Sequence, residues 1–489
     1  MKWMWLWLVF FAVFFVRLFF AFQVPFFSSD VAYLQARVVD HLVSSPSPLF
    51  FDSLGWGGRY LMANVFHYVL AFFSLFLPEF FVFKVVPNLL ASLIVFPVFL
   101  IVYRITKRFS VSLFCALLSA FVPVFFIHTF NHLSVMSLVV PLFFFLIYAW
   151  LRIPSKFWVV FYVFGIVFFS FLHPFSIVFV LGLTLYVVLM KIEGLRVSVA
   201  ELELLLFSLA FVFWSQFLIY KNFILFHGFK VIWQNIPFEL LSEHFFRLPV
   251  WGVVLEVGLF PLIFGIFIFY KRVFRTKKGF FYLFFGFACL ITFLLWLRLI
   301  ELFYGLMLIG IILVVLFGSW LVLFESYLKK TRVAGLRNIL TLLLLFFVLF
   351  SSFVPVVVGV EKELRETISS DVFDAFLWLK NNSSPDSVVL APVHFGHYIT
   401  ALSNRTNVID SVFLLQAHGN ERFKDVRRVF SSVLETEVVD ILDKYDVDYV
   451  IVPKEQNAVV FSNNACFDLV FDKSVRVFRK SPGCRLKVV

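Results

Sequence analysis

The chain has 489 residues, of which 62% are hydrophobic and 75 are phenylalanine, and its mean hydropathy is +0.98. This composition excludes an ordinary soluble globule and predicts an integral membrane protein. The formal net charge is +11, but the excess of Lys and Arg lies in short loops between apolar segments, at 103–108, 271–278 and 329–337. Short basic loops orient a membrane protein, and we predict no groove for nucleic acid.

Apolar segments recur from residue 3 to residue 358, each close to the ~20 residues that a bilayer core requires. Only Lys2 precedes the first segment and no small-residue cleavage site follows it, so we expect a retained anchor. The segment at 60–77 carries polar residues along one face at helical spacing, which favours a helix in the membrane interface. We predict about eleven spans, at residues 3–22, 80–103, 110–127, 133–150, 157–172, 175–190, 204–220, 250–270, 280–297, 302–324 and 339–358.

The positive-inside rule gives the expected orientation. If the segment at 60–77 does not cross the bilayer, all the basic loops fall on one side, and that side and the N-terminus are cytoplasmic. The chain is then a multi-pass protein of the cell membrane. Its membrane domain is expected at 1–360, with two substantial external connections at 23–79 and 223–249.

Residues 361–489 are expected to form a soluble extracytoplasmic domain. Their apolar residues predict helices in SDVFDAFLWLKNN and ETEVVDILDKYD and strands in SVVLAP and DYVIVP, which together indicate a small α/β domain. Cys466 and Cys484 lie here and would pair in an oxidising compartment. Cys115 and Cys289 fall in apolar spans and are expected to be packing residues.

The loop after the first span carries one carboxylate, Asp30, where the membrane surface is expected. An acid at this depth is costly unless it has a partner or a task, so Asp30 is a candidate functional residue. Ser28, Ser29 and Asp30 also suit the N-cap of the helix predicted to follow. The two interpretations are compatible.

Several motifs, taken in chain order, resemble the catalytic subunits of oligosaccharyltransferases, which are membrane glycosyltransferases of the GT-C class. SSDVAYLQARVVDHL, PLFFDSLGWGG and VVPNLLASLIVFPVFLIVYRITKRF are similar to the front of those subunits. LLSEHF resembles their external-loop motif ending in a glutamate, and LRLIELFYGLMLIG resembles their arginine-bearing late span. FLWLKNNSSPDSVVLAPVHFGHYI and ILDKYDVDYVIVP look like the start of their external domain. The resemblance implies a GT-C-like fold and a sugar donor carried on a polyprenyl phosphate or diphosphate.

The resemblance also implies roles for three residues. Asp30 and Glu243 would hold a divalent metal, Mn or Mg, and activate the acceptor, and Arg298 would pair with the donor phosphate. These residue types suit the roles, because a guanidinium forks onto phosphate oxygens and carboxylates bind hard cations or take a proton. Other roles stay open: a membrane-interface anchor or a partner of Glu301 for Arg298, and a solvated loop acid for Glu243.

The second external turn departs from the family pattern. The family carries an acidic pair there, whereas this chain reads FIHTFNHLSVM, with His128, Asn131 and His132. Histidines can ligate metals, so His132 is a candidate ligand beside Asp30 and Glu243. Capping or packing is the alternative role for these histidines.

The tail departs as well. The family recognises its acceptor with two tryptophans, an aspartate, a tyrosine and a glycine, and this chain offers PVHFG at 392–396. His394 stands where the aspartate would be. His394 and His397 are therefore candidate acceptor-site residues, with a surface pair on a turn as the alternative.

These features predict a transferase that moves a sugar or oligosaccharide from a lipid-linked donor to an external protein or glycan. With no acid in the second turn, a metal-free variant that uses one aspartate as general base on a hydroxyl is a further hypothesis. Two other classes stay open: a catalytically degenerate relative that binds lipid-linked glycans, and a transporter.

Overall fold

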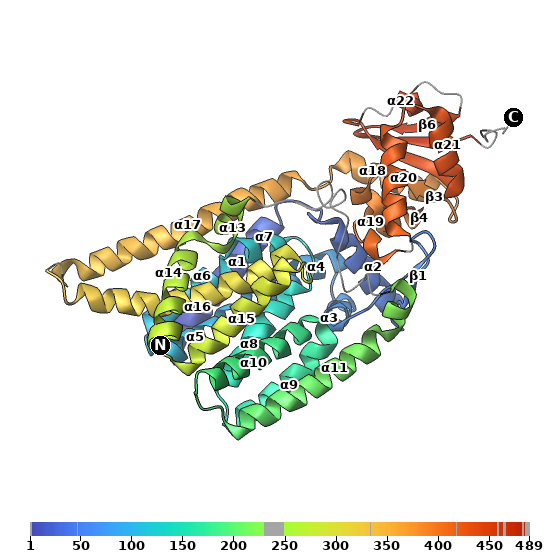
Figure 1. Cartoon of the computed structure of the whole chain (residues 1–489). Coiled ribbons are helices and arrows are strands. Elements are labelled where there is room, and N and C mark those ends of the chain that lie inside the picture. Colours follow the sequence, from blue (N-terminus) through green and yellow to red (C-terminus); the bar gives the residue numbers. More distant parts are fainter. Residues whose placement is uncertain are drawn as a thin grey trace.

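A computed structural model gives the fold as a long helical bundle with a smaller α/β domain at one end (Figure 1). The structure describes residues 2–45, 47–228, 249–332, 334–416, 418–456, 459–462, 466–481 and 484.

Apolar helices build the bundle. They are α1 (Lys2–Ala21), α4 (Glu79–Ser92), α5 (Val95–Thr106), α6 (Phe109–Ala120), α7 (Pro123–Phe130), α8 (Met136–Leu151), α9 (Lys156–Leu172), α10 (Phe175–Ile192), α11 (Val199–His227), α13 (Val250–Val257), α14 (Leu259–Phe269), α15 (Gly279–Trp296), α16 (Leu302–Leu328) and α17 (Arg337–Arg365), with a π-helical turn, η2 (Tyr270–Arg275), after α14.

Within the residues that the structure describes, seven helices are long and apolar enough to cross a membrane, or up to nine spans if each of two bent pairs counts as one. The bent pairs are α6 with α7, at 49°, and α13 with the helix that begins at α14, at 87°. Pro123 begins α7, and Gly258, with φ of +97°, separates α13 from α14; both residue types favour such breaks. The remaining predicted spans fall on the shorter apolar helices α8 and α9. The predicted polytopic helical fold class is confirmed.

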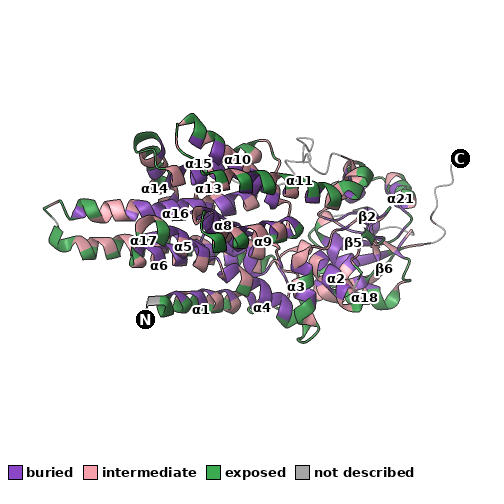
Figure 2. Ribbon diagram, turned by 90° about the horizontal axis from the view of Figure 1, so that it is seen from below, coloured by how far each residue is buried: buried purple, intermediate pink, exposed green. Residues whose placement is uncertain are grey.

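The exposure of the helices fits a lipid environment. The most apolar 18-residue window of Leu302–Leu328 is 78% buried, whereas those of Trp3–Ala21 and Ala334–Arg365 are 28% and 22% buried. α16 therefore forms the centre of the bundle, and Figure 2 shows exposed residues along α1 and α17. The exposed side chains of these outer helices include many Phe, Leu and Trp residues, as expected where lipid replaces water.

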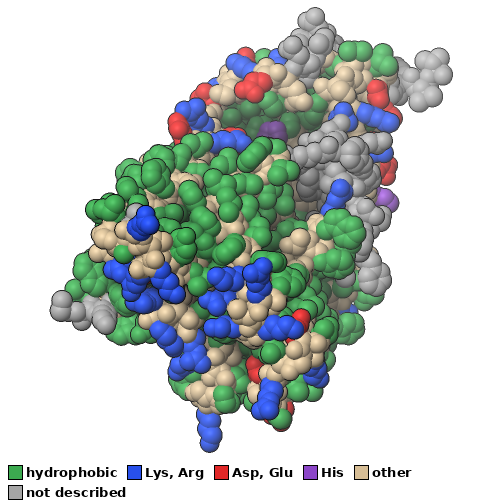
Figure 3. Space-filling model, turned by 60° about the vertical axis from the view of Figure 1, so that its left-hand side comes forward, with side chains coloured by type: hydrophobic (Ala, Val, Ile, Leu, Met, Phe, Trp, Pro, Cys, Tyr) green, Lys and Arg blue, Asp and Glu red, His purple; other side chains and the backbone are tan. Residues whose placement is uncertain are grey.

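Lys and Arg side chains gather at the bundle end farthest from the C-terminal domain (Figure 3). Exposed residues in the connections at this end include Lys107, Arg108, Lys277, Lys278 and Lys330. The basic loops of the sequence thus lie at one end of the bundle. This is the arrangement expected if the segment at 60–77 does not cross the bilayer.

The first loop, which is expected to be external, folds into α2 (Asp30–Ser44), the hairpin β1 (Phe51–Asp52) with β2 (Arg59–Tyr60), and α3 (Val65–Ser74). α3 has 10 residues, or about 15 Å of length, which is too short to cross a bilayer. Asn64 caps α3 in a capping box with His67, and the His67 ring also contacts the Gln35 side chain of α2. The polar stripe predicted on this helix therefore packs partly against α2.

The C-terminal domain is a sheet with helices on it. Its elements are α18 (Ser370–Asn382), β3 (Val388–Leu390), α19 (Gly396–Tyr398), β4 (Thr406–Asn407), α20 (Gly419–Ser431), α21 (Glu435–Lys444), β5 (Val447–Pro453), α22 (Val459–Ser462), β6 (Phe467–Asp472) and β7 (Val475–Lys480).

The strand order of this sheet is β4-β3-β5-β7-β6, with β3 parallel to both β4 and β5, and β7 antiparallel to both β5 and β6. The four segments predicted from sequence become α18, α21, β3 and β5. Ser369 caps α18 by accepting a hydrogen bond from the Val372 amide, as N-cap serines do. Cys466 and Cys484 form the disulfide that the sequence allowed.

A buried ion pair fastens the first loop to the C-terminal domain. Arg59 donates from Nε to Asp52 Oδ2 at 3.0 Å and from Nη1 to Asp410 Oδ2 at 2.7 Å, and its side chain is fully buried. The backbones join as well, because the Trp56 amide donates to the Asn407 carbonyl at 2.9 Å and the Asn407 amide donates to the Leu54 carbonyl at 2.9 Å. The loop thus extends the β4 edge of the sheet.

Replacing Arg59 should loosen this junction. We expect Arg59→Met to cost about 3–5 kcal/mol, because it leaves Asp52 and Asp410 buried without their shared cation. Arg365→Met is the matched control: Arg365 pairs with Glu361 on the surface, with exposures of 76% and 59%, and its loss should cost under about 1 kcal/mol. Thermal unfolding in detergent measures both. Equal melting temperatures for the two variants would show that the buried pair does not stabilise the junction.

Candidate functional site

A cavity of about 640 Å³ lies where the bundle meets the first loop and the C-terminal domain. Its walls come from α2, α3, the α7–α8 turn, the α9–α10 turn, α11, the start of α16 and the end of α17, and Leu415 of the C-terminal domain also lines it. The described lining of the cavity therefore comes from the bundle, the first loop and the C-terminal domain.

Asp30 is the first residue of α2, at the edge of this cavity. Its neighbours Ser29 and Val31 line the cavity. Ser29 occupies the N-cap position but its side chain makes no capping hydrogen bond. Among the described residues, Asp30 Oδ2 is buried with no hydrogen-bond partner. The carboxyl group also interacts with the backbone of Asp30 and Val31 and with Ser411, so capping interactions leave one of its oxygens without a partner.

The surroundings of Asp30 favour its neutral form. Burial raises the pKa of Asp30 from its usual 3.8 to about 6, and the negative charge of Asp410 acts in the same direction. The Ser411 hydroxyl partly opposes the shift. A carboxyl group with such a pKa changes its charge near neutral pH, which suits a group that exchanges protons with a bound molecule.

Asp410 differs from Asp30 although the two lie close together. Arg59 holds the pKa of Asp410 far below its usual range, at about 2, and so keeps the carboxylate charged. Arg37, from α2, forms a second ion pair with Asp52. The C-terminal domain thus presents a fixed negative charge next to an acid that titrates.

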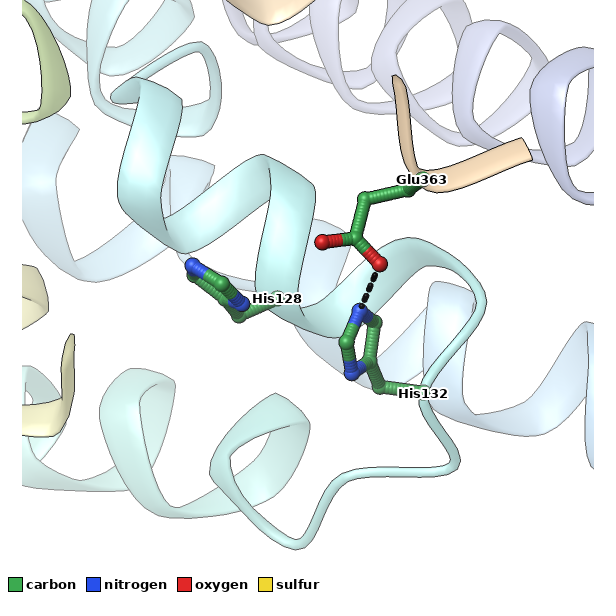
Figure 4. Close-up of side chains that lie close together, drawn as sticks. All are labelled: His128, His132 and Glu363. Carbon is green, nitrogen blue, oxygen red and sulfur yellow. Dashed lines mark hydrogen bonds and ion pairs between the residues drawn. The ribbon is translucent and has the colours of Figure 1, made fainter. Parts of the chain in front are cut away.

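A second group of side chains lies on the bundle side of the cavity (Figure 4). His128 comes from α7, His132 from the α7–α8 turn and Glu363 from the end of α17. His132 Nε2 lies 3.0 Å from Glu363 Oε2, and the two imidazole rings have centroids 5.5 Å apart. One nitrogen or oxygen from each residue lies within 4.8 Å of the others. The two histidines of this group stand in the turn where the sequence lacks an acidic pair.

Buried polar contacts hold that turn in place. Asn131 donates from Nδ2 to Ser28 Oγ at 2.8 Å and to the Phe26 carbonyl at 3.1 Å. Lys84 of α4 donates to the Asn131 side chain and, at 3.2 Å, to the same Phe26 carbonyl. His132 and the loop that carries Asp30 are therefore tied together through Asn131.

Arg298 and Glu243 cannot be placed in the cavity. Glu243 lies outside the residues that the structure describes. Arg298 is exposed in the connection between α15 and α16, with φ of +57°. Glu301, which follows it, lines the cavity and interacts with Tyr304 and His132. The arginine thus lies in the α15–α16 connection, outside the cavity lining.

The two candidate acceptor-site histidines lie in different surroundings. His394 is exposed and lines a separate groove of the C-terminal domain with Phe423 and Arg427. His397 is fully buried, 3.7 Å from Asp410 Oδ1, and burial lowers its pKa to about 4. The imidazole of His397 is therefore neutral at physiological pH, and the two residues do not form a surface pair.

No protein-family model matches the chain. The STT3B subunit of dolichyl-diphosphooligosaccharide–protein glycosyltransferase from Arabidopsis thaliana is 33% identical over 85 residues, which are 17% of this chain and 11% of that protein. The chain therefore matches about a tenth of the length of this curated relative.

Two solved structures share the architecture. The oligosaccharyltransferase AglB from Archaeoglobus fulgidus, in complex with an inhibitory peptide and a dolichol-phosphate, superposes with a TM-score of 0.66 at 13% identity, over 91% of this chain and 69% of AglB. ArnT from Cupriavidus metallidurans bound to undecaprenyl phosphate superposes with a TM-score of 0.56 at 11% identity, over 98% of both chains. The chain has a GT-C fold. At these identities the likeness concerns the fold alone.

Sequence reasoning missed several residues of this candidate site. Glu363 looked like one of many charges after the last span, and Arg59 and Asp52 looked like ordinary loop residues. The partners of these residues come from distant parts of the chain, since Arg59 and Asp410 are 351 positions apart.

The raised pKa of Asp30 predicts that Asp30→Asn stabilises the protein. The unfolded carboxyl titrates near 3.8 and the folded one near 6, so the wild type loses stability as pH rises between these values. The stabilisation by Asn should be absent below about pH 4 and complete above about pH 6. Melting temperatures of both proteins across this range test it. A variant that is less stable than the wild type at pH 7 would contradict the raised pKa.

Proposed function

We propose that the protein is a membrane glycosyltransferase that moves a sugar or oligosaccharide from a polyprenyl phosphate or diphosphate to an extracytoplasmic protein or glycan. The observation that carries the proposal is a GT-C fold over at least nine tenths of the chain, with a cavity of about 640 Å³ next to Asp30. The related structures hold a dolichol-phosphate and an undecaprenyl phosphate, which supports a lipid-linked donor.

The donor phosphate would lie at the α15–α16 end of the cavity. Arg298 is exposed in that connection, which would lie at the membrane boundary. A guanidinium stays charged at such a boundary and donates two parallel hydrogen bonds to phosphate oxygens. The polyprenyl chain would remain in lipid, along the apolar outer faces of the helices.

Asp30 would act as the general base. The nucleophilic oxygen of an acceptor hydroxyl attacks the anomeric carbon, the bond from that carbon to the phosphate oxygen breaks, and the lipid phosphate or diphosphate leaves as the anion. The hydroxyl proton passes to the carboxylate of Asp30. A pKa of about 6 lets the residue hold that proton and later release it to water at neutral pH.

A hydroxyl acceptor fits this site better than a peptide amide. The PVHFG segment lacks the tryptophans and the aspartate of the family motif. His394, at the place of that aspartate, lines a groove separate from the cavity. We therefore propose His394 and its groove as a secondary contact for the acceptor, with transfer to a hydroxyl group at the cavity.

The orientation is part of the proposal. The basic end of the bundle would face the cytoplasm, with the N-terminus inside, and the C-terminal domain would lie outside the cell membrane. The gathered Lys and Arg residues (Figure 3) and the disulfide Cys466–Cys484 support this, because disulfides persist in oxidising compartments.

An assay of sugar transfer tests the proposed reaction. Purified protein in nanodiscs should move radiolabelled sugar from a polyprenyl-phosphate or polyprenyl-diphosphate donor to an acceptor extract. The rate should rise about tenfold per pH unit up to pH 6 and then level, because only ionised Asp30 accepts a proton. Asp30→Asn should lower the rate at least 100-fold and leave donor binding unchanged.

A donor-binding assay tests the phosphate-binding role of Arg298 separately from the catalytic role of Asp30. Arg298→Ala should weaken binding of the lipid-linked sugar about tenfold or more, whereas Lys330→Ala, at the opposite end of the bundle, should not. If the wild type binds neither kind of carrier and Arg298→Ala behaves like Lys330→Ala, the glycosyltransferase proposal is wrong.

Labelling of introduced cysteines tests the orientation. Val433 is 78% exposed in the C-terminal domain, and Lys330 is exposed at the basic end. A membrane-impermeant maleimide should label Val433→Cys in intact cells and should label Lys330→Cys only after the cells are opened. The parent protein, with its free cysteines Cys115 and Cys289, gives the background. The reverse pattern would contradict the proposed topology.

A further inference from the structure

The C-terminal domain carries three short motifs of the form Asn-x-Ser or Asn-x-Thr, the acceptor sequence for N-linked glycans. They begin at Asn381, Asn382 and Asn404, and none of these asparagines lines the cavity beside Asp30. Because so short a motif often occurs by chance, its local structure decides whether it can be an acceptor. We propose that Asn404 carries an N-linked glycan and that Asn381 and Asn382 do not.

Asn404 presents its side chain to solvent at a turn. It is exposed and follows the π-helical turn η5 (Ile399–Ser403), with φ of +53° and ψ of +47°, a left-handed conformation that Asn tolerates better than most residues. Its backbone amide donates to the Ile399 carbonyl, and its carbonyl accepts from Arg405 Nη1 at 3.0 Å. Within the described chain, its side-chain amide is left without a hydrogen-bond partner.

The middle residue of this motif, Arg405, points into the domain and holds the turn in place. Its side chain is 5% exposed, and it donates from Nε to Ser383 Oγ at 2.7 Å and from Nη2 to the Lys380 and Ser383 carbonyls at 2.8 Å. With Arg405 buried, Asn404 is exposed and Thr406 is partly exposed. The amide and the hydroxyl of the motif are therefore both accessible from solvent.

The motif that begins at Asn381 has a different geometry, because Asn381 lies within α18. Its third residue is Ser383, whose hydroxyl donates to the Leu379 carbonyl at 2.5 Å and accepts from Arg405 Nε. Residues two positions apart on a helix do not face each other. The hydroxyl of this motif is thus occupied and turned away from the asparagine.

The amide of Asn382 is already used by the fold. Asn382 is the last residue of α18, and its Nδ2 donates to the Trp378 carbonyl at 2.8 Å. Since Nδ2 is the atom that would carry the sugar, this hydrogen bond holds the acceptor nitrogen against its own helix. Of the three motifs, the one at Asn404 is therefore the one whose acceptor groups are both free of such contacts in the described structure.

The modification is a group transfer from a polyprenyl-diphosphate-linked oligosaccharide. Asn404 Nδ2 forms a bond to the anomeric carbon, the bond from that carbon to the phosphate oxygen breaks, the lipid diphosphate leaves, and a base of the transferring enzyme takes one amide proton. Because we propose a hydroxyl acceptor for this chain, we assign the transfer to a separate N-glycosylating enzyme. The inference rests on the extracytoplasmic orientation within the proposed function, which the disulfide Cys466–Cys484 supports.

Glycopeptide mapping of the full-length protein tests the inference. The protein is produced in eukaryotic secretory cells, treated with an amidase that releases N-glycans in heavy-oxygen water, and digested for mass spectrometry. We expect the heavy-oxygen label at Asn404 in most copies and none at Asn381 or Asn382. On a gel, the mass of the glycan should be lost in Asn404→Gln and Thr406→Ala and kept in Thr406→Ser, which retains the hydroxyl.

Two controls separate the glycan from the orientation. Asn382→Gln should leave the glycan in place. The double variant Val433→Asn with Glu435→Thr creates a motif in the α20–α21 connection, where Val433 is 78% exposed, and reports the side of the membrane on which the domain lies.

Each outcome bears on a stated claim. If the introduced motif is modified and Asn404 is not, the inference is wrong and the orientation stands. If neither is modified, both the orientation and the inference are wrong. A glycan mass that persists in Asn404→Gln would also overturn the assignment. A glycan at Asn404 together with failure of sugar transfer in nanodiscs would count against the proposed reaction alone.

Discussion

The pairing of Arg59 with Asp52 and Asp410 is the constraint on which the junction of the first loop with the C-terminal domain depends. Its three charges are buried, so each would be costly alone, and they are tolerable because each carboxylate reaches the guanidinium. The same contact sets the position of Asp410, whose charge acts on Asp30. Burial is the larger cause of the raised pKa of Asp30, and the junction between loop and domain adds the nearby charge of Asp410.

In the bundle, buried cations are paired with neutral polar groups instead of carboxylates. Arg17 is fully buried and donates from Nε to Asn88 Oδ1 at 3.0 Å, and Lys84 donates to Asn131 and to backbone carbonyls of the first loop. Inside a membrane such groups must find their partners within the protein. These partners lie on α4, the first loop and the α7–α8 turn. The hydrogen bonds of the buried cations therefore also hold the backbone that carries His132.

The sequence predicted those features that depend on local composition. Hydropathy located the helices, and alternating patterns located α18, α21, β3 and β5, because a period of apolar residues is a property of a short segment. The site depends on contacts between distant segments. Asp30 was recognisable because a lone acid at a membrane edge is unusual. Glu363 and Arg59 were not, since their roles arise from side chains hundreds of positions away or in another helix.

The cavity receives its chemistry from separate parts of the fold. The histidine and glutamate cluster belongs to the bundle, whereas the pKa of Asp30 is raised by burial and by the charge of Asp410 of the C-terminal domain, and lowered by Ser411. Removal of that domain would expose Asp30 to water and return its pKa toward 3.8, leaving a much weaker base. The domain thus acts on the site even without touching a substrate. This gives a physical reason for fastening it to the first loop by buried charges, since exposed pairs contribute little to stability.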